Sequence, residues 1–203
     1  MNKRTIFEKG FTLVELLIVI ALIAILSVAV LATINPIEQA NKARDAKFKN
    51  DSAEVLSAFE RYYISKGVYP WNDPSVTGYV AINTGITMSS DSQLFGVRGV
   101  GNSLGVLITT DELKASFIGK EPWVTGALPA DKLEAITDGS STNYVCFCPK
   151  AVANRKDLAK MKCISGNTVI PAAATGCVLT DPKAVTFCDA PSATKANRMC
   201  VPE

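Results

Sequence analysis

Residues 9–26 read KGFTLVELLIVIALIAIL, an apolar run that carries one carboxylate, that of Glu15, near its start. The segment without any other charge extends from Phe11 to Ile34. As a helix rising about 1.5 Å per residue, this segment is about 36 Å long. It is therefore longer than the hydrocarbon core of a bilayer, which is about 30 Å thick. The run predicts a membrane-spanning helix that has an acid where lipid is expected.

The residues before the apolar run are basic at Lys3, Arg4 and Lys9. By the positive-inside rule, they keep residues 1–10 in the cytoplasm and place the chain after Ile34 outside. The cysteines agree with this orientation, because an even number confined to one region indicates a disulfide framework in an oxidising compartment. The candidates are Cys146, Cys148, Cys163, Cys177, Cys188 and Cys200.

The cysteine spacing leaves the connectivity of these disulfides open. Cys146 and Cys148 are too close to pair comfortably with each other. If they lie on a strand, they face the same side. We therefore expect each of them to reach a different partner.

The composition argues against an enzyme. The 203 residues include no histidine, so there is no imidazole base for a Ser or Cys nucleophile and no imidazole metal ligand. No Cys-x-x-Cys pair occurs either, which argues against a zinc site. We expect no catalytic site, no metal and no cofactor. The net charge of +2 is too small to indicate a nucleic-acid partner by itself.

A secretory signal peptide is the alternative interpretation of the first residues. Small residues suitable for a signal peptidase occur at Ser27–Ala29 and at Val30–Ala32. The apolar run is longer than the roughly 7–15 residues usual in such peptides. A signal peptide also gives Glu15 no role, so this interpretation is disfavoured.

The segment Lys9–Glu15, KGFTLVE, follows a short basic leader and precedes an apolar helix. It resembles the class III signal of type IV pilins and of the related type II secretion pseudopilins. The resemblance implies that a prepilin peptidase removes the leader, residues 1–10, by cutting after Gly10. The same enzyme would N-methylate the new terminus, Phe11.

The resemblance also implies the partners and the location of the protein. It would begin as a single-pass protein of the cytoplasmic membrane and end in a cell-surface filament. Its partners would be further copies of itself in a helical homopolymer, minor pilins, a pilus assembly platform protein and its ATPase machinery.

The position of Glu15 has a physical interpretation in such a filament. A carboxylate at the middle of a membrane helix costs about 2.5 to 3.5 kcal/mol, but Glu15 lies only about 6 Å along the helix from Phe11, near the interface. Packed among other helices, the carboxylate needs a cationic partner. The amine of a neighbour's Phe11 is cationic near neutral pH. We expect this pair to set the axial register of the subunits, as buried polar groups do in coiled coils.

Residues 35–66 predict an amphipathic continuation of the helix. Pro36 predicts a kink or a short melted stretch, since proline removes a backbone donor. Gly67 and Pro70 predict the end of the helix at Lys66. The residues expected on its buried face are Phe48, Ser52, Val55, Leu56, Phe59, Tyr62 and Tyr63, and those expected on the solvent face include Asp51 and Glu54. The aromatic residues near the helix exit are expected to pack in the core, the alternative being a stacking surface for a ligand.

We therefore expect an α+β fold, in which a long N-terminal helix packs against a small antiparallel sheet of about four strands. Residues 67–203 would form the extracytoplasmic region, with a variable surface connection over 67–103 and the sheet and cysteine-rich end over 104–203. Strands are predicted at 104–109, 143–148, 176–180 and 184–188, and short helices at 109–117 and 129–136.

A basic cluster raises one further possibility, namely contact with DNA or an anionic surface through phosphates. An ordinary solvated helix is the favoured interpretation of this cluster, which comprises Lys150, Arg155, Lys156, Lys160 and Lys162, with Asp157 opposing. The leading hypothesis for the whole chain is a structural subunit of a type IV pilus or pilus-like filament. The alternatives are a type II secretion pseudopilin and, more remotely, a secreted disulfide-rich binding module.

Overall fold

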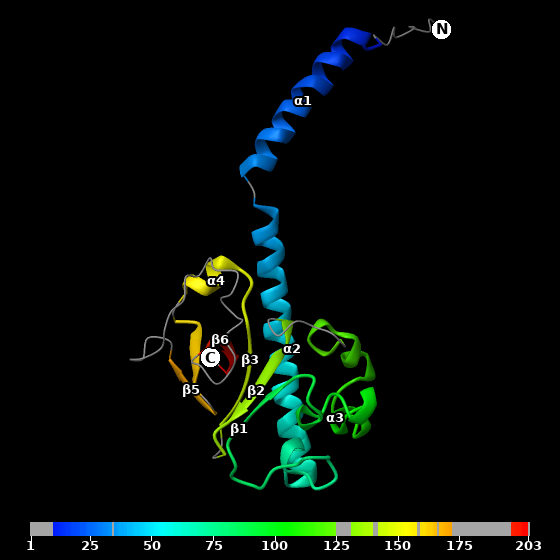
Figure 1. Ribbon diagram of the computed structural model, residues 1–203. Helices are drawn as coiled ribbons and strands as arrows, with labels where there is room; N and C mark the ends of the chain where they lie inside the picture. Colours follow the sequence, from blue (N-terminus) through cyan, green and yellow to red (C-terminus); the bar gives the residue numbers. More distant parts are fainter. Residues whose placement is uncertain are drawn as a thin grey trace, which may run out of the picture. The chain divides into compact units, whose positions relative to one another are not determined.

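The computed structural model describes residues 10–33, 35–124, 131–139, 142–157, 159–165, 167–171 and 196–202. The chain divides into two compact units, residues 1–39 and residues 40–203. Helix α1, Leu13–Thr33, lies in the first unit, and helix α2, Pro36–Lys66, begins there and continues through the second (Figure 1).

Helix α1 is apolar on all sides, and its large side chains are exposed. A helix of this kind needs an apolar environment around it. The helix ends at Thr33, and Pro36 is the first residue of α2. Proline is well tolerated there, because the N–H that it lacks has no partner within the helix. The Asn35 side chain accepts a hydrogen bond of 3.2 Å from the N–H of Glu38 and so caps the new helix. Pro36 is thus the start of a separate helix.

Helix α2 buries one face, at positions that recur every three or four residues as helical packing requires. Its buried residues are Asp45, Phe48, Asp51, Ser52, Val55, Ala58, Phe59 and Tyr62. The prediction was wrong for Tyr63, which is 46% exposed, and for Asp51, which is buried because Lys120 pairs with it at 2.6 Å. The helix ends at Lys66, as its stop signal predicts, and Gly67 takes the left-handed φ of 75° that commonly follows a helix.

Within the described residues, the sheet has six strands, all pairs antiparallel, in the order β1-β2-β3-β6-β4-β5. The strands are β1 Ile86–Ser89, β2 Leu133–Thr137, β3 Asn143–Phe147, β4 Met161–Ser165, β5 Thr168–Pro171 and β6 Ala196–Val201. The last strand therefore inserts between two earlier ones. The predicted α+β fold of a long helix on an antiparallel sheet is confirmed, with six strands where about four were expected.

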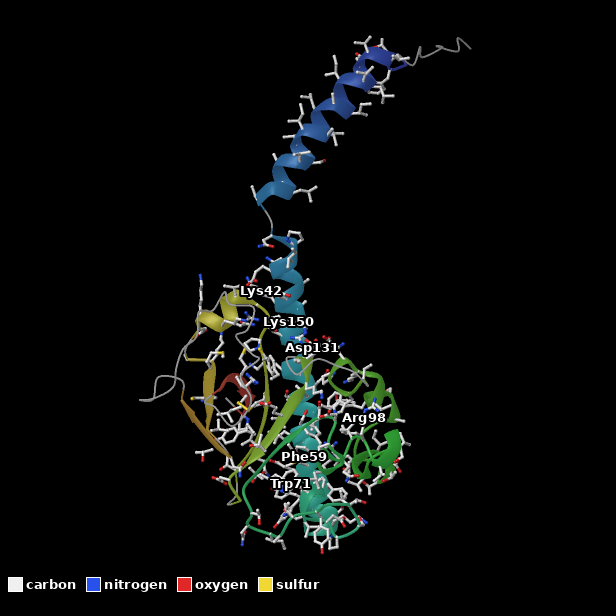
Figure 2. All side chains as sticks on the ribbon, in the orientation of Figure 1. Lys42, Phe59, Trp71, Arg98, Asp131 and Lys150 are labelled. Atoms are coloured by element: carbon white, nitrogen blue, oxygen red, sulfur yellow. A yellow bond between two sulfur atoms is a disulfide. The ribbon has the colours of Figure 1, made fainter. Side chains whose placement is uncertain are left out.

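The main core lies between α2 and the sheet, and it extends to the segment that follows α2. The Phe48 ring packs edge-on against the Phe147 ring of β3, with 5.9 Å between centroids. Nearer the C-terminal end of α2, the Phe59 ring contacts the ring of Trp71, with 5.1 Å between centroids (Figure 2). It also contacts the ring of Phe95, with 5.5 Å between centroids. Each such fully buried side chain stabilises the fold by about 1.5 to 3 kcal/mol relative to exposure.

The segment 67–103 is more than the surface connection expected. It contains β1, and it places Trp71, Phe95 and Val97 in the core. Its backbone is mostly irregular, so no periodic pattern in the sequence predicts which of its side chains are buried. The short helices of the second unit are α3 Val106–Thr109 and α4 Val152–Lys156, with 3-10 turns at Pro70–Asn72, Gln93–Phe95, Val100–Asn102, Ala115–Gly119 and Glu121–Trp123.

Three local predictions were wrong. The strand expected over 104–109 is helix α3, preceded by an isolated bridge between Leu104 and Arg98. A short apolar run does not distinguish strand from helix. The helix expected over 109–117 is interrupted at Asp111, whose φ is 61°. The helix expected over 129–136 is replaced by β2, because pairing with β1 and β3 overrides the local signal. The strand predicted at 143–148 is confirmed as β3, and those at 176–180 and 184–188 lie outside the described residues.

One disulfide joins Cys146 and Cys200, which are directly opposite each other on β3 and β6. The bond links residues 54 positions apart, so it fixes the inserted last strand beside β3. Cys148 and Cys163 are disulfide-bonded as well, and Cys146 and Cys148 thus reach different partners, as expected. Cys177 and Cys188 lie outside the described residues.

Candidate functional site

The start of α1 is closed by reciprocal hydrogen bonds between Thr12 and Glu15. The Thr12 backbone N–H and the Thr12 hydroxyl each donate to Oε2 of Glu15 at 2.8 Å. In return, the Glu15 N–H donates to the Thr12 hydroxyl at 3.2 Å. This arrangement is a capping box, which satisfies two backbone donors that a helix start otherwise leaves without partners. The acid at the start of the apolar run therefore has a structural role within a single chain.

The capping box leaves part of the Glu15 carboxylate available. Both hydrogen bonds to the carboxylate use Oε2, and Oε1 accepts none from any residue in the described part of the chain. Each carboxylate oxygen offers two lone pairs. Glu15 can therefore keep its hydrogen bonds from Thr12 and still accept a hydrogen bond at Oε1 from a cationic group of another molecule. The ring of Phe11, one position before Thr12, is 87% exposed.

Gly10 is not required by packing. A Cβ placed on Gly10 would meet nothing within 4 Å, and its backbone φ is not in the left-handed region. A larger residue would therefore fit the folded chain. The small residue at this position points to a requirement outside the fold, such as recognition by an enzyme that binds the backbone closely.

The rest of α1 leaves little polar surface for lipid or for neighbouring helices. The Ser27 hydroxyl donates to the Ile23 carbonyl at 2.7 Å, and the Thr33 hydroxyl donates to the Val30 carbonyl at 2.8 Å. Hydroxyls bonded in this way are satisfied inside the helix. Residues Leu13–Leu31 have a mean hydropathy of 3.0 and are long enough to cross a membrane, and none of them is buried in the fold.

Two neighbouring charged residues of α2, Arg44 and Asp45, bind later segments of the second unit. The buried carboxylate of Asp45 accepts hydrogen bonds from the N–H groups of Lys150 and Ala151, at 2.8 and 3.0 Å, and from the Asn154 amide at 2.8 Å. Asp45 thereby holds the start of α4 against α2. The adjacent Arg44 donates to the carboxylates of Glu121 and Asp131, at 3.1 and 2.6 Å, and its guanidinium lies over the Phe48 ring.

The basic cluster that the sequence indicated is partly neutralised. Lys150 pairs with Asp131 at 2.6 Å (Figure 2), and Lys160 pairs with Asp157 at 2.9 Å. The Arg155 side chain donates to the Pro149 carbonyl at 2.6 Å. Lys156 lies at the end of α4 and Lys162 lies on β4. The structure therefore offsets part of the charge of this cluster.

The described residues contain no group of three or more His, Cys, Asp or Glu side chains placed to hold a metal ion. The functional residue missed from the sequence is Thr12. Its signal was present, because a Ser or Thr followed three residues later by an acid before an apolar run is the pattern of a capping box.

The comparisons with known proteins agree with the geometry at this end of the chain. The model of the prokaryotic N-terminal methylation motif matches residues 7–31. This range covers Gly10, Phe11, the capping box and most of α1. No curated protein and no solved structure is significantly similar to the chain.

Proposed function

Because the chain carries the N-terminal methylation motif, the class III prepilin signal typical of type IV pilins and pseudopilins, we propose that this pilin-like protein is a structural subunit of a type IV pilus or pilus-like filament. The observation that carries the proposal is the arrangement of Gly10, Phe11, Thr12 and Glu15 at the start of an exposed apolar helix. In this function the chain is a building block and performs no catalysis.

Processing would separate the leader, residues 1–10, from the mature chain. A prepilin peptidase cuts after Gly10, where packing does not require glycine, and methylates the amine of Phe11. The new cation then lies beside Thr12, at the N-terminal, partly positive end of α1, which disfavours an isolated cation and so favours its pairing with a carboxylate. The helix remains in the cytoplasmic membrane until the assembly platform protein and its ATPase machinery transfer the subunit to the filament.

Assembly would use the same helix a second time. The exposed apolar side chains of α1 exchange lipid for the α1 helices of other subunits. Glu15 then needs a cation, because an unpaired carboxylate among apolar helices is strongly unfavourable. Oε1 of Glu15 accepts a hydrogen bond from the protonated Phe11 amine of a neighbouring subunit. Oε2 keeps its two hydrogen bonds from Thr12. This pairing sets the axial register.

Mass spectrometry of the mature N-terminus tests the proposal. The expected chain begins at Phe11 and carries one methyl group on its amine. Gly10→Leu should leave the leader attached, because a bulky side chain obstructs close binding of the backbone. Gly119→Leu is the matched control, since Gly119 also has open space around its Cβ position and no left-handed φ. A mature chain that begins near Val30 or Thr33 would contradict the proposal and support a secreted binding module.

A type II secretion pseudopilin remains the second candidate, because it shares the methylation motif. The disulfides and the long segment between α2 and β2 favour the pilin. Electron microscopy of cells that lack this gene separates the two, since a pilin predicts surface fibres that disappear on deletion. Loss of secretion with no change in surface fibres would favour the pseudopilin.

DNA or an anionic surface is a further partner to test. Charge reversal at Lys156 and Lys162 in assembled filaments should reduce DNA retention, and the difference should be larger at low salt. Lys47→Glu together with Lys114→Glu, both at exposed positions outside the cluster, makes the same change in net charge and serves as the control. Equal retention by all filaments at two salt concentrations removes DNA as a partner of this cluster.

A further inference from the structure

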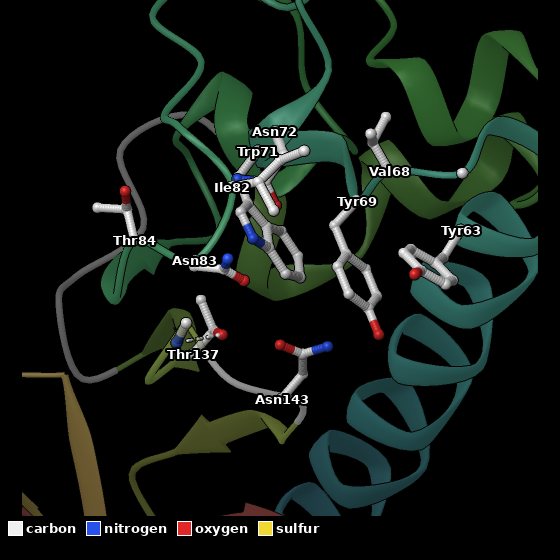
Figure 3. A pocket seen from close by; sticks show the side chains of 12 residues that line it. Tyr63, Val68, Tyr69, Trp71, Asn72, Ile82, Asn83, Thr84, Thr137 and Asn143 are labelled. Atoms are coloured by element: carbon white, nitrogen blue, oxygen red, sulfur yellow. Dashed lines mark hydrogen bonds between the residues drawn. The ribbon is translucent and has the colours of Figure 1, made fainter.

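A pocket of about 220 Å³ opens where the chain leaves α2 (Figure 3). One wall comes from Tyr63 and from residues 67–72, which follow the end of the helix. The opposite wall comes from residues 82–84 and from Thr137 and Asn143, at the ends of β2 and β3. The pocket lies entirely within the second unit and involves none of the residues at the start of α1.

Three aromatic rings form a rigid stack beside the pocket. The centroids of Tyr63 and Tyr69 are 4.7 Å apart, and those of Tyr69 and Trp71 are 4.8 Å apart with the rings 5° from parallel. Trp71 is only 2% exposed, and its ring packs edge-on against the buried ring of Phe59. Tyr63, at the other end of the stack, is 46% exposed. The stack is therefore anchored in the core at one end and open to solvent at the other.

Neutral polar groups lie around the same space. Figure 3 shows the amides of Asn83 and Asn143 and the hydroxyl of Tyr69 directed toward it. Burial raises the pKa of the Tyr69 hydroxyl more than its hydrogen bond with Asn143 lowers it, so this group stays neutral. The Thr137 hydroxyl accepts a hydrogen bond of 3.1 Å from the N–H of Gly139.

Gly139 determines how closely the two walls approach. Its φ is 84°, and a Cβ at this position would lie 2.5 Å from the Asn83 carbonyl oxygen. Any other residue would push the turn that carries Asn83 away from β2. The glycine therefore brings the Asn83 amide to the edge of the pocket.

The lining defines the chemistry of a ligand. No lining residue among those described is formally charged, so nothing there selects an anion or a cation. The rings add apolar surface to the lining, and Tyr63 carries the open ring face, because Tyr69 has a ring stacked on each face and Trp71 is 2% exposed. An apolar ring face packs against apolar C–H groups, while amides and hydroxyls can donate to and accept from hydroxyl groups. We propose that this pocket binds one neutral sugar residue. Its volume is below the roughly 300–1,000 Å³ of pockets for drug-sized ligands, which matches a single sugar unit better than a longer segment.

Binding can be measured on the full-length mature chain in phosphocholine detergent micelles, whose headgroups contain no sugar. Saturation-transfer-difference NMR would be recorded with the methyl glycosides of glucose, galactose, N-acetylglucosamine and N-acetylgalactosamine, and with anionic N-acetylneuraminic acid. We expect saturable binding of at least one neutral glycoside, with a Kd on the order of 1 mM, and none of the anionic sugar.

Two variants with matched controls assign the binding to the pocket. Asn83→Gly removes the amide and still allows the left-handed φ of 65°, and Asp111→Gly makes the corresponding change at an exposed residue with φ of 61° outside the pocket. Tyr63→Ala is matched by Tyr79→Ala, a tyrosine that is 51% exposed and does not line the pocket.

Each pocket variant should weaken binding by about fivefold or more, as expected for a lost hydrogen bond or ring contact. The controls should bind as the unmodified chain does. Absence of saturable binding by every neutral glycoside, equal binding by all variants, or binding of the anionic sugar alone would overturn the proposal. These binding measurements do not test the identity of the mature N-terminus. The filament proposal is therefore tested independently of the sugar proposal.

Discussion

Oε2 of Glu15 accepts two hydrogen bonds of 2.8 Å from Thr12, one from the backbone N–H and one from the hydroxyl. The acid that interrupts the apolar run thus has hydrogen-bond partners on one oxygen within its own chain. This division of the carboxylate separates the capping seen within the chain from the pairing between chains that we propose, and different substitutions can distinguish the two.

Thr12→Val should weaken the start of α1 without changing its shape much. The valine keeps the volume of threonine but removes the hydroxyl, and loss of a capping side chain costs about 0.5 to 2 kcal/mol. Amide hydrogen exchange at Glu15 and Leu16, whose N–H groups donate to the Thr12 hydroxyl and carbonyl, should become about threefold or more faster in micelles. Thr12→Ser keeps the hydroxyl and serves as the control. Equal exchange in the two variants would mean that the capping box contributes nothing.

Glu15→Ala should be inserted and processed but should enter filaments at least about tenfold less efficiently, because the neighbour's buried amine loses its partner. The measurement is the ratio of variant to unmodified subunits in purified filaments from cells that express both. Glu38→Ala, which removes an acid from the first turn of α2, provides the comparison. If the Glu15 variant enters filaments as well as the unmodified chain, the register role of Glu15 is wrong.

Asp45→Asn should lower the free energy of unfolding by about 2 to 4 kcal/mol. The carboxylate is 1% exposed and accepts three hydrogen bonds at the start of α4, and an amide cannot accept them all. Thermal unfolding of the full chain in micelles, followed by near-UV circular dichroism, measures the loss. Asp111→Asn, at an exposed position, should unfold as the unmodified chain does. A midpoint unchanged by Asp45→Asn would show that water replaces these bonds.

The pair of Tyr62 and Asp73 should make stability depend on acid pH. Burial raises the pKa of Asp73, but hydrogen bonds from the Tyr62 hydroxyl and from Ser75 lower it more, so the pKa lies below its ordinary value. Burial, followed by the bond to Asp73, raises the pKa of Tyr62, which therefore remains a donor. A carboxyl with a lowered folded pKa stabilises the fold above its unfolded pKa, and this contribution is lost as the pH falls through the folded value.

Tyr62→Phe should therefore destabilise the protein by about 1 to 2 kcal/mol at pH 7. The difference from the unmodified chain should shrink as the pH falls below about 4, near the unfolded pKa of Asp. Thermal unfolding at several pH values checks this, with Tyr79→Phe as the control at an exposed tyrosine. A difference that does not change with pH would exclude Asp73 as the titrating partner.

The predictable parts of this fold are those governed by local patterns. The end of α2 at Lys66 followed from Gly67 and Pro70, and the buried positions Phe48, Val55 and Phe59 followed from helical spacing. Asp45 and Asp51 were not predictable as buried residues, because their burial depends on Ala151 and Lys120, which are distant in the sequence. Trp71 and Phe95 lie on irregular backbone, where no period reveals which side chains face the core.

The sequence by itself determined the prepilin-like motif and the apolar helix that follows it. Gly10, Phe11 and Glu15 are recognised by spacings of a few residues, and α1 requires only that its residues be apolar, so both features are readable without a fold. Tertiary structure alone decided the order of the sheet, the pairing of Cys146 with Cys200 and the pocket beside Tyr69. These depend on a last strand that inserts between two earlier ones and on walls drawn from separate segments, and such contacts leave no local period in the sequence.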